Sequence, residues 1–193
     1  MIRVSLDLEM NQEPTGGTPI IQVGACIFNS ETGEIIDKFD QYVKSKTIIT
    51  PYINNLCGIH QRHIDAAQEL NRVYWDFVEF MQKHPKCIRQ LVTWGGGDRA
   101  ELKKQLIDWY VDNEGCYIEE LWKLGYTEMN VKNIHQYLRE KEGKSTQGGL
   151  ARSMLKYGLQ FEGTKHNALD DSINTAKIYC HMLNHVDIKK LLS

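Results

Sequence analysis

The chain has 193 residues, of which 41% are hydrophobic and 25% charged, and its formal net charge is −2. These values are typical of a water-soluble globular protein, and the length suffices for a substantial buried core. The net charge also shows that the chain lacks the strong overall positive charge that usually marks a nucleic-acid binder. No run is long and apolar enough to span a membrane, so we expect no membrane partner.

The cysteines and the N-terminus indicate a cellular location. The five cysteines are an odd number, are scattered, and show no C-x-x-C spacing. This pattern favours reduced thiols over a disulfide framework or a zinc site. The N-terminus lacks the layout of a signal peptide. We therefore expect a cytoplasmic protein, and because we find no linker or repeat, a single domain over residues 1–193.

The first predicted strand, Met1 to Glu9, carries two acidic residues in an apolar, β-prone run. Side chains two apart in a strand share a face, so Asp7 and Glu9 point the same way, with Leu6 and Leu8 buried on the other side. Two adjacent carboxylates repel each other unless a cation lies between them. The strand alone leaves two interpretations open: a divalent metal site, or an edge strand with two solvated acids.

The next segments predict a small antiparallel sheet. A polar turn at residues 11–17 leads to a largely buried strand at 19–28, and turn residues 29–33 lead to a third strand at 34–43. Their short spacing suggests that the three strands form a meander. Pro51 near the first helical position predicts a short helix that ends near Gly58.

Helices and strands alternate in the remaining chain. Apolar residues at helical spacing predict a helix facing the core from about Leu70 to Met81. The further expected elements are a strand at 87–94, a helix after Asp98, a short helix near Leu121, a short strand at 129–131, a helix from about Ile134 that Gly143 ends, a helix at 147–157 capped by Gly158, and a last helix at 167–183. The expected fold is α/β, a mixed sheet with helices on both faces.

Charge is unevenly distributed along the chain. Residues 132–165 contain seven Lys or Arg and three Glu, whereas residues 99–128 are net acidic. A basic segment beside an acidic site can hold a phosphate backbone, but it is more often a solvated helical surface. The segment supports nucleic-acid binding without requiring it.

Three further residues occupy positions that a ligand site can use. Asp98 follows a predicted strand at a glycine-rich turn, and strand ends are favoured ligand positions in open α/β sheets. His166 precedes the last helix, and Asp171 lies one turn into it. Two alternatives stay open: Asp98 as a helix N-cap, and Asp170 in place of Asp171.

Taken together, these motifs resemble a known family. Asp7-x-Glu9, a central Asp98, and His166 separated by four residues from Asp171 are similar to the three motifs of the DEDDh 3′→5′ exonucleases. Residues 20–25 resemble the family's second strand, and residues 158–163 lead into the histidine motif as in relatives. Trp94 before Asp98 is closest to the branch related to RNA-interference-regulating exonucleases.

The resemblance implies a fold, a chemistry and a set of site residues. The implied fold is ribonuclease-H-like: three antiparallel strands and then parallel strands. The implied activity is the two-metal hydrolysis of single-stranded DNA or RNA with a free 3′ end, releasing nucleoside 5′-monophosphates. Two divalent cations, Mg²⁺ or Mn²⁺, are expected on four carboxylates, with a histidine as general base and three tentative substrate contacts. The expected metal ligands are Asp7, Glu9, Asp98 and Asp171, and the expected general base is His166. The tentative substrate contacts are Met10, Leu56 and Cys57.

Two other functions are compatible with the sequence. One is a nucleic-acid-binding relative without catalytic activity, although such a protein has no need for His166. The other is a metal-dependent phosphatase acting on small phosphate esters. His60, His63 and His135 are interpreted as structural.

Overall fold

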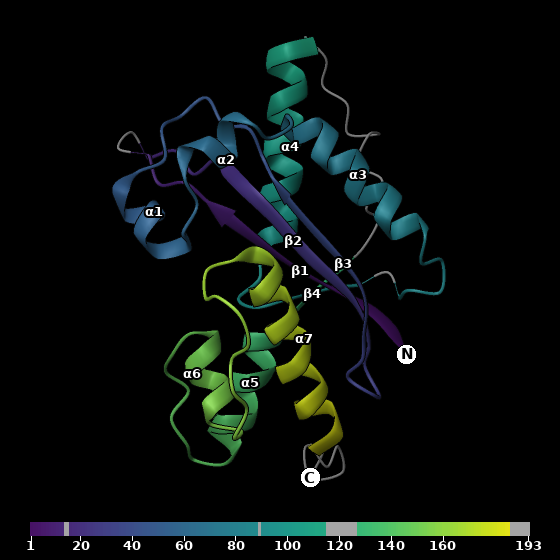
Figure 1. The fold of residues 1–193 in the computed structure, drawn as a ribbon. Coiled ribbons are helices and arrows are strands. Elements are labelled where there is room, and N and C mark those ends of the chain that lie inside the picture. Colours follow the sequence, from purple (N-terminus) through teal and green to yellow (C-terminus); the bar gives the residue numbers. More distant parts are fainter. Residues whose placement is uncertain (14–15, 89, 115–126, 186–193) are drawn as a thin grey trace.

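The computed structural model describes residues 1–13, 16–88, 90–114 and 127–185. Within these ranges the chain forms five strands and seven helices (Figure 1). The strands are β1 (Ile2–Met10), β2 (Ile20–Asn29), β3 (Ile35–Tyr42), β4 (Gln90–Thr93) and β5 (Thr127–Asn130). The helices are α1 (Pro51–Cys57), α2 (Gln61–Asp65), α3 (Leu70–Gln82), α4 (Asp98–Glu114), α5 (Val131–Lys141), α6 (Leu150–Leu155) and α7 (Ala168–His185).

The strands form one mixed sheet in the order β3-β2-β1-β4-β5. β1, β2 and β3 pair antiparallel as the expected meander, whereas β1 with β4 and β4 with β5 pair parallel. The ribonuclease-H-like arrangement expected from the sequence is therefore confirmed. Because β1, β4 and β5 run parallel, their carboxyl ends meet at one edge of the sheet.

Helices cover both faces of the sheet (Figure 1). The side chains of β1 alternate between the two faces. Val4, Leu6 and Leu8 join the buried cluster that α3 and α4 complete on one face. On the opposite face, α5, α6 and α7 pack over Phe28 and Val92. The alternation expected for the first strand is confirmed, since Asp7 and Glu9 lie between the apolar positions.

Several boundaries differ from those expected. The helix expected at 147–157 begins only at Leu150, because Gly148 has a φ of 124° and Gly149 is an extended N-cap. It ends at Leu155, and Gly158, with a φ of 72°, follows two residues after the cap Lys156. The fourth strand is shorter than expected. The helix expected near Leu121 lies outside the described residues.

The sequence did not indicate α2 at all. This helix has five residues, too few for a periodic apolar pattern, and it begins after His60 in a local cap with His63. Ile64 anchors α2 in a third apolar cluster, which also contains Ile53 and Cys57 of α1. This cluster fixes α1 and α2 beside the carboxyl end of β1. No helix in the described parts of the chain has both the length and the apolar character needed to cross a membrane.

Candidate active site

The site begins at the carboxyl half of β1. In the pairing with β2, Asp7 lies opposite Gly24 and Glu9 opposite Gln22. Asp7 is half-buried and Glu9 is buried, with 9% of its surface exposed. The regular strand therefore holds two carboxylates in fixed positions on the face that α7 covers.

Gly24 allows the N-terminus of α7 to come close to this pair. A Cβ atom on Gly24 would lie 2.1 Å from the backbone of Ala168 and Leu169, so no other residue fits without displacing the helix. Beside it, the buried Gln22 accepts a hydrogen bond from the N–H of Ala168 at 3.1 Å. Its amide donates to Asp40 of β3 at 2.7 Å. The contact between β2 and α7 is thus specified by two neighbouring inward-facing positions.

This approach brings Asp171 and His166 to Glu9. The three residues come from widely separated parts of the chain. Each offers one possible metal-ligand atom, and these three atoms all lie within 4.8 Å of one another. His166 is exposed and has a left-handed φ of 60°, the single non-glycine residue of this kind in the described chain. Its backbone N–H donates to the carboxylate of Asp171. The unusual conformation aims the imidazole toward the acids, as expected at a functional site.

The structure also separates Asp170 from Asp171. Asp170 accepts a hydrogen bond from the N–H of Thr164 at 2.7 Å and lies against Gly163, so it holds the preceding turn. Asp171 lies on the side of Glu9 instead. Of the two neighbouring acids, only Asp171 belongs to the candidate site.

Asp98 enters from the other side of β1. It is the first residue of α4 and follows a turn of three glycines after β4. It lies outside the compact group formed by Glu9, His166 and Asp171, but its charge acts strongly on Asp7. Asp7 therefore connects the Asp98 side of the site to the Asp171 side.

The electrostatics of these carboxylates are unfavourable without a cation. Burial, and then the charges of Asp98, Asp171 and Glu9, raise the pKa of Asp7 well above its usual value. Burial raises the pKa of Asp98 in the same direction, with a further contribution from Glu128. None of the ion pairs found in the described residues involves these acids.

The other two acids show the same trend. Burial raises the pKa of Glu9 to about 7, although a hydrogen bond from Cys57 acts against it. Burial raises the pKa of Asp171 to about 6, opposed by the hydrogen bond from the His166 backbone. The four carboxylates repel one another, and divalent cations, which prefer carboxylate oxygen, are the natural counter-charge. The donor set thus fits Mg²⁺ or Mn²⁺.

One of the three expected substrate contacts lies directly against Glu9. Cys57, at the end of α1, is buried and donates its thiol hydrogen to Glu9 at 3.3 Å. Leu56 packs against the α1–α2 cluster, and Met10 packs partly against the main core. Asn11 ties the segment before α1 to the end of β1 through bonds to Ile48 and Thr50. Their role toward a substrate stays a prediction.

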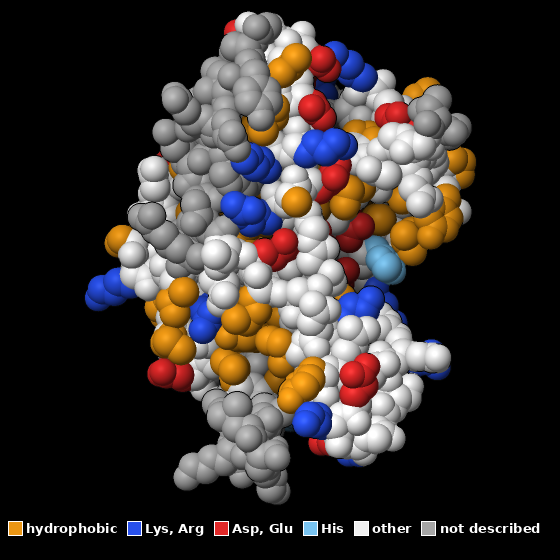
Figure 2. All heavy atoms as spheres, turned by 180° about the vertical axis from the view of Figure 1, so that it is seen from behind, with side chains coloured by type: hydrophobic (Ala, Val, Ile, Leu, Met, Phe, Trp, Pro, Cys, Tyr) orange, Lys and Arg blue, Asp and Glu red, His pale blue; other side chains and the backbone are white. Residues whose placement is uncertain are grey.

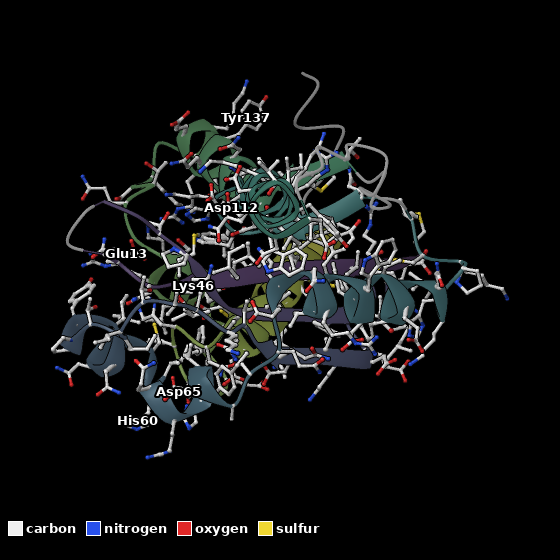
Figure 3. The ribbon with its side chains drawn as sticks, turned by 90° about the horizontal axis from the view of Figure 1, so that it is seen from above. Glu13, Lys46, His60, Asp65, Asp112 and Tyr137 are labelled. Carbon is white, nitrogen blue, oxygen red and sulfur yellow. The ribbon has the colours of Figure 1, made fainter. Side chains whose placement is uncertain are left out.

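The three histidines interpreted as structural have local roles. His60 contacts Asn54 at 2.7 Å and lies at the outer edge of the molecule (Figure 3). His63 stacks on Tyr42. His135 is buried and bonds to Tyr157 at 3.0 Å. None of the three belongs to the acidic group.

The surface around the site carries both charges. Figure 2 shows acidic side chains and a histidine where this face of the molecule is hollowed, with basic side chains next to them. Part of the basic segment is already engaged: Lys144 pairs with Glu142 at 2.9 Å, and Lys156 donates to two backbone carbonyls. The segment is therefore a mixed surface rather than a continuous positive patch.

A family model described as Exonuclease matches residues 4–179, a range that contains every candidate site residue named above. The chain belongs to the exonuclease family. Among solved structures, the nuclease domain of 3′hExo, described as a DEDDh family member bound to rAMP, superposes with a TM-score of 0.75. It is 23% identical, and the match covers 95% of this chain and 92% of that domain. The exonuclease family match and this shared fold together confirm the DEDDh resemblance seen in the sequence.

Two further similar proteins help to place the chain. The rat 3′-5′ exoribonuclease 1 is 26% identical over 172 residues, which cover 85% of this chain and 46% of that protein. The structure of Escherichia coli Exonuclease I in complex with a dT13 oligonucleotide has a TM-score of 0.67 at 14% identity, covering 99% of this chain and 42% of that one. The chain spans less than half the length of the mammalian relatives that it matches.

Sequence reasoning missed one acid beside the candidate site and one contact within it. Glu128 of β5 lies close enough to raise the pKa of Asp98, but it falls in a segment whose strand is short and mostly polar. The missed contact is the hydrogen bond from the Cys57 thiol to Glu9. Neither relation has a local sequence signal, since each joins residues from distant elements.

Proposed function

We propose that residues 1–193 form a single exonuclease domain that hydrolyses phosphodiester bonds from the 3′ end of single-stranded nucleic acid. The observation that carries the proposal is the gathering of Glu9, Asp171 and His166 within 4.8 Å, with Asp7 coupled to the same group and to Asp98. The names of the relatives, 3′-5′ exoribonucleases among them, support the direction of cleavage.

The cofactors in this proposal are two divalent cations, Mg²⁺ or Mn²⁺. Asp7, Glu9, Asp98 and Asp171 would hold them, because Glu9 is buried, the other three are half-buried, and all four repel one another and form no ion pair within the described residues. When bound, such ions acidify water and neutralise charge on the phosphate. Without them the carboxylates ionise less readily than usual, because burial and their mutual repulsion raise the pKa of each.

The remaining chemistry falls to His166. It is exposed, so solvent reaches its imidazole, and it lies against Glu9 and Asp171. In the proposed mechanism it takes the proton from the attacking water, a role suited to histidine because its usual pKa lies near neutrality. The products are a nucleoside 5′-monophosphate and a strand one nucleotide shorter with a new 3′ hydroxyl.

Two finer assignments belong to the same proposal. Cys57 contacts Glu9, Leu56 precedes it in α1, and Met10 follows Glu9 in β1, so the terminal nucleotide would lie between the end of β1 and α1. A cytoplasmic location agrees with the four cysteines of the described chain, Cys26, Cys57, Cys87 and Cys180, which are all free and buried.

The decisive experiment uses 5′-labelled single-stranded RNA and DNA of matched sequence. We expect shortening from the 3′ end with release of 5′-monophosphates in Mg²⁺ or Mn²⁺, and no reaction in EDTA. A 3′-phosphate should inhibit strongly, since the site receives a free 3′ hydroxyl. Cleavage of a circular strand would indicate an endonuclease. Hydrolysis of a small phosphate ester with no attack on oligonucleotides would indicate a phosphatase.

A further inference from the structure

Asp98 is presented by a turn that has little conformational preference of its own. Gly95, Gly96 and Gly97 all have positive φ, of 104°, 74° and 103°. Glycine visits such conformations freely and loses more entropy than other residues when it is fixed in one. A turn of three consecutive glycines therefore needs contacts from elsewhere to hold Asp98 in one position.

Glu128 of β5 supplies the first of these contacts. Its Oε1 atom accepts a hydrogen bond from the Gly97 N–H at 3.0 Å and another from the Thr93 hydroxyl at 3.0 Å. Thr93 is the last residue of β4 and Gly97 the residue before Asp98. One carboxylate oxygen thus joins the two ends of the turn.

Asn130 supplies the second contact from the same strand. Its side-chain amide donates to the Gly95 carbonyl at 2.6 Å, and a Cβ on Gly96 would lie 2.9 Å from that nitrogen. The side-chain oxygen of Asn130, Oδ1, also accepts a hydrogen bond from the Asn133 N–H and so caps α5. Because Glu128 and Asn130 are two residues apart in β5, they face the turn from the same side.

From these contacts we propose that Glu128 and Asn130 form a clamp that positions Asp98 in the candidate metal site. The inference rests on the proposed function for its catalytic consequence. Both are positioning residues, since they act on Asp98 through the turn. The Glu128 charge lies close enough to repel Asp98, so an uncharged hydrogen-bond acceptor at position 128 would give a more stable fold. The added negative charge at the site is a further attraction for divalent cations.

The test compares Glu128→Ala with Glu128→Gln, which keeps the Oε1 acceptor. Glu140→Ala, at an exposed glutamate on α5, is the control. Three quantities are measured: Mn²⁺ affinity from the free-ion EPR signal, kcat and KM on a labelled oligonucleotide, and hydrogen exchange of the peptide containing residues 95–98. We expect Glu128→Ala to lower Mn²⁺ affinity and kcat each by roughly 10- to 100-fold, as for other residues that orient metal ligands, with KM little changed.

Glu128→Gln should keep most of the wild-type Mn²⁺ affinity and kcat. Hydrogen exchange at residues 95–98 should be faster than in the wild type in Glu128→Ala, but not in Glu128→Gln or Glu140→Ala. If Glu128→Ala matches the control in all three measurements, the clamp is wrong. Equal damage from Ala and Gln also contradicts it, since the charge rather than the acceptor is then what matters.

Asn130→Asp provides a test if Glu128→Ala does not fold. This change keeps the acceptor that caps α5 but replaces the donor to Gly95 with an oxygen. We expect lower Mn²⁺ affinity and faster exchange at residues 95–98, and wild-type behaviour would overturn the clamp. Binding of Mn²⁺ by a wild-type protein that does not shorten oligonucleotides would refute the proposed function alone, because affinity and exchange still decide the clamp.

Discussion

The two halves of the site are built in opposite ways. Asp7 and Glu9 lie on a regular strand, enclosed by neighbouring strands and by α7. His166 lies in an exposed turn with a left-handed backbone. The difference teaches what each half can do: buried carboxylates on a strand suit cations that need fixed geometry, whereas an exposed imidazole can exchange protons with water.

The largest expected effect comes from Asp7, which couples to every other acid of the site. Asp7→Asn keeps the shape and removes the charge, so we expect turnover to fall by roughly 10³-fold or more, since cation binding contributes several kcal/mol. In chelator the same variant should unfold at a higher temperature, because the repulsion from Asp98, Asp171 and Glu9 is relieved. Asp108→Asn, at an exposed position of α4, is the control. Retained activity in Asp7→Asn would remove the buried half from the mechanism.

Replacing His166 tests the exposed half. His166→Ala should lower kcat by about 10²-fold, toward the lower end of the range for a general base because water still reaches the exposed site. Mn²⁺ affinity should be unchanged. A loss of Mn²⁺ affinity would instead make the imidazole a ligand, which its distance to Glu9 and Asp171 permits. Turnover equal to that of the wild type would make His166 an ordinary turn residue.

A smaller effect should follow from disturbing the contact that joins the two halves. Gly24→Ala places a methyl group within 2.1 Å of the α7 backbone, so the helix must shift. We expect a loss of about 1–3 kcal/mol in stability from overpacking. We also expect a loss of about tenfold in kcat, because Asp171 and His166 move with the helix. Ala25→Gly, at the neighbouring buried position that faces the other layer, controls for a general loss of stability. Normal turnover in a destabilised Gly24→Ala would show that the site does not depend on this approach.

The same contrast explains what the sequence could predict. Asp7, Glu9 and the β1–β3 meander were predictable, because strand alternation and turn residues act locally. His166 and Asp171 could be paired with them only through the family resemblance, since a contact between β2 and α7 spans 146 positions in sequence. The Glu128 and Cys57 contacts and helix α2 were not predictable, because they depend on how distant elements pack.

The most direct test of the central claim measures the free energy of unfolding against pH, in chelator and in saturating Mn²⁺. In the folded chain the pKa is about 7 for Glu9 and about 6 for Asp171, whereas unfolded carboxyls titrate near 4. The folded state therefore holds more protons between these values, so stability in chelator should fall as pH rises from about 4 to 7 and then level off.

With Mn²⁺ the trend should reverse, because the ion binds the deprotonated carboxylates and stabilises only the folded state. The gain from Mn²⁺ should thus be small at pH 5 and large at pH 8. If the curves with and without Mn²⁺ coincide across this range, the buried acids hold no divalent cation and the proposed mechanism is wrong.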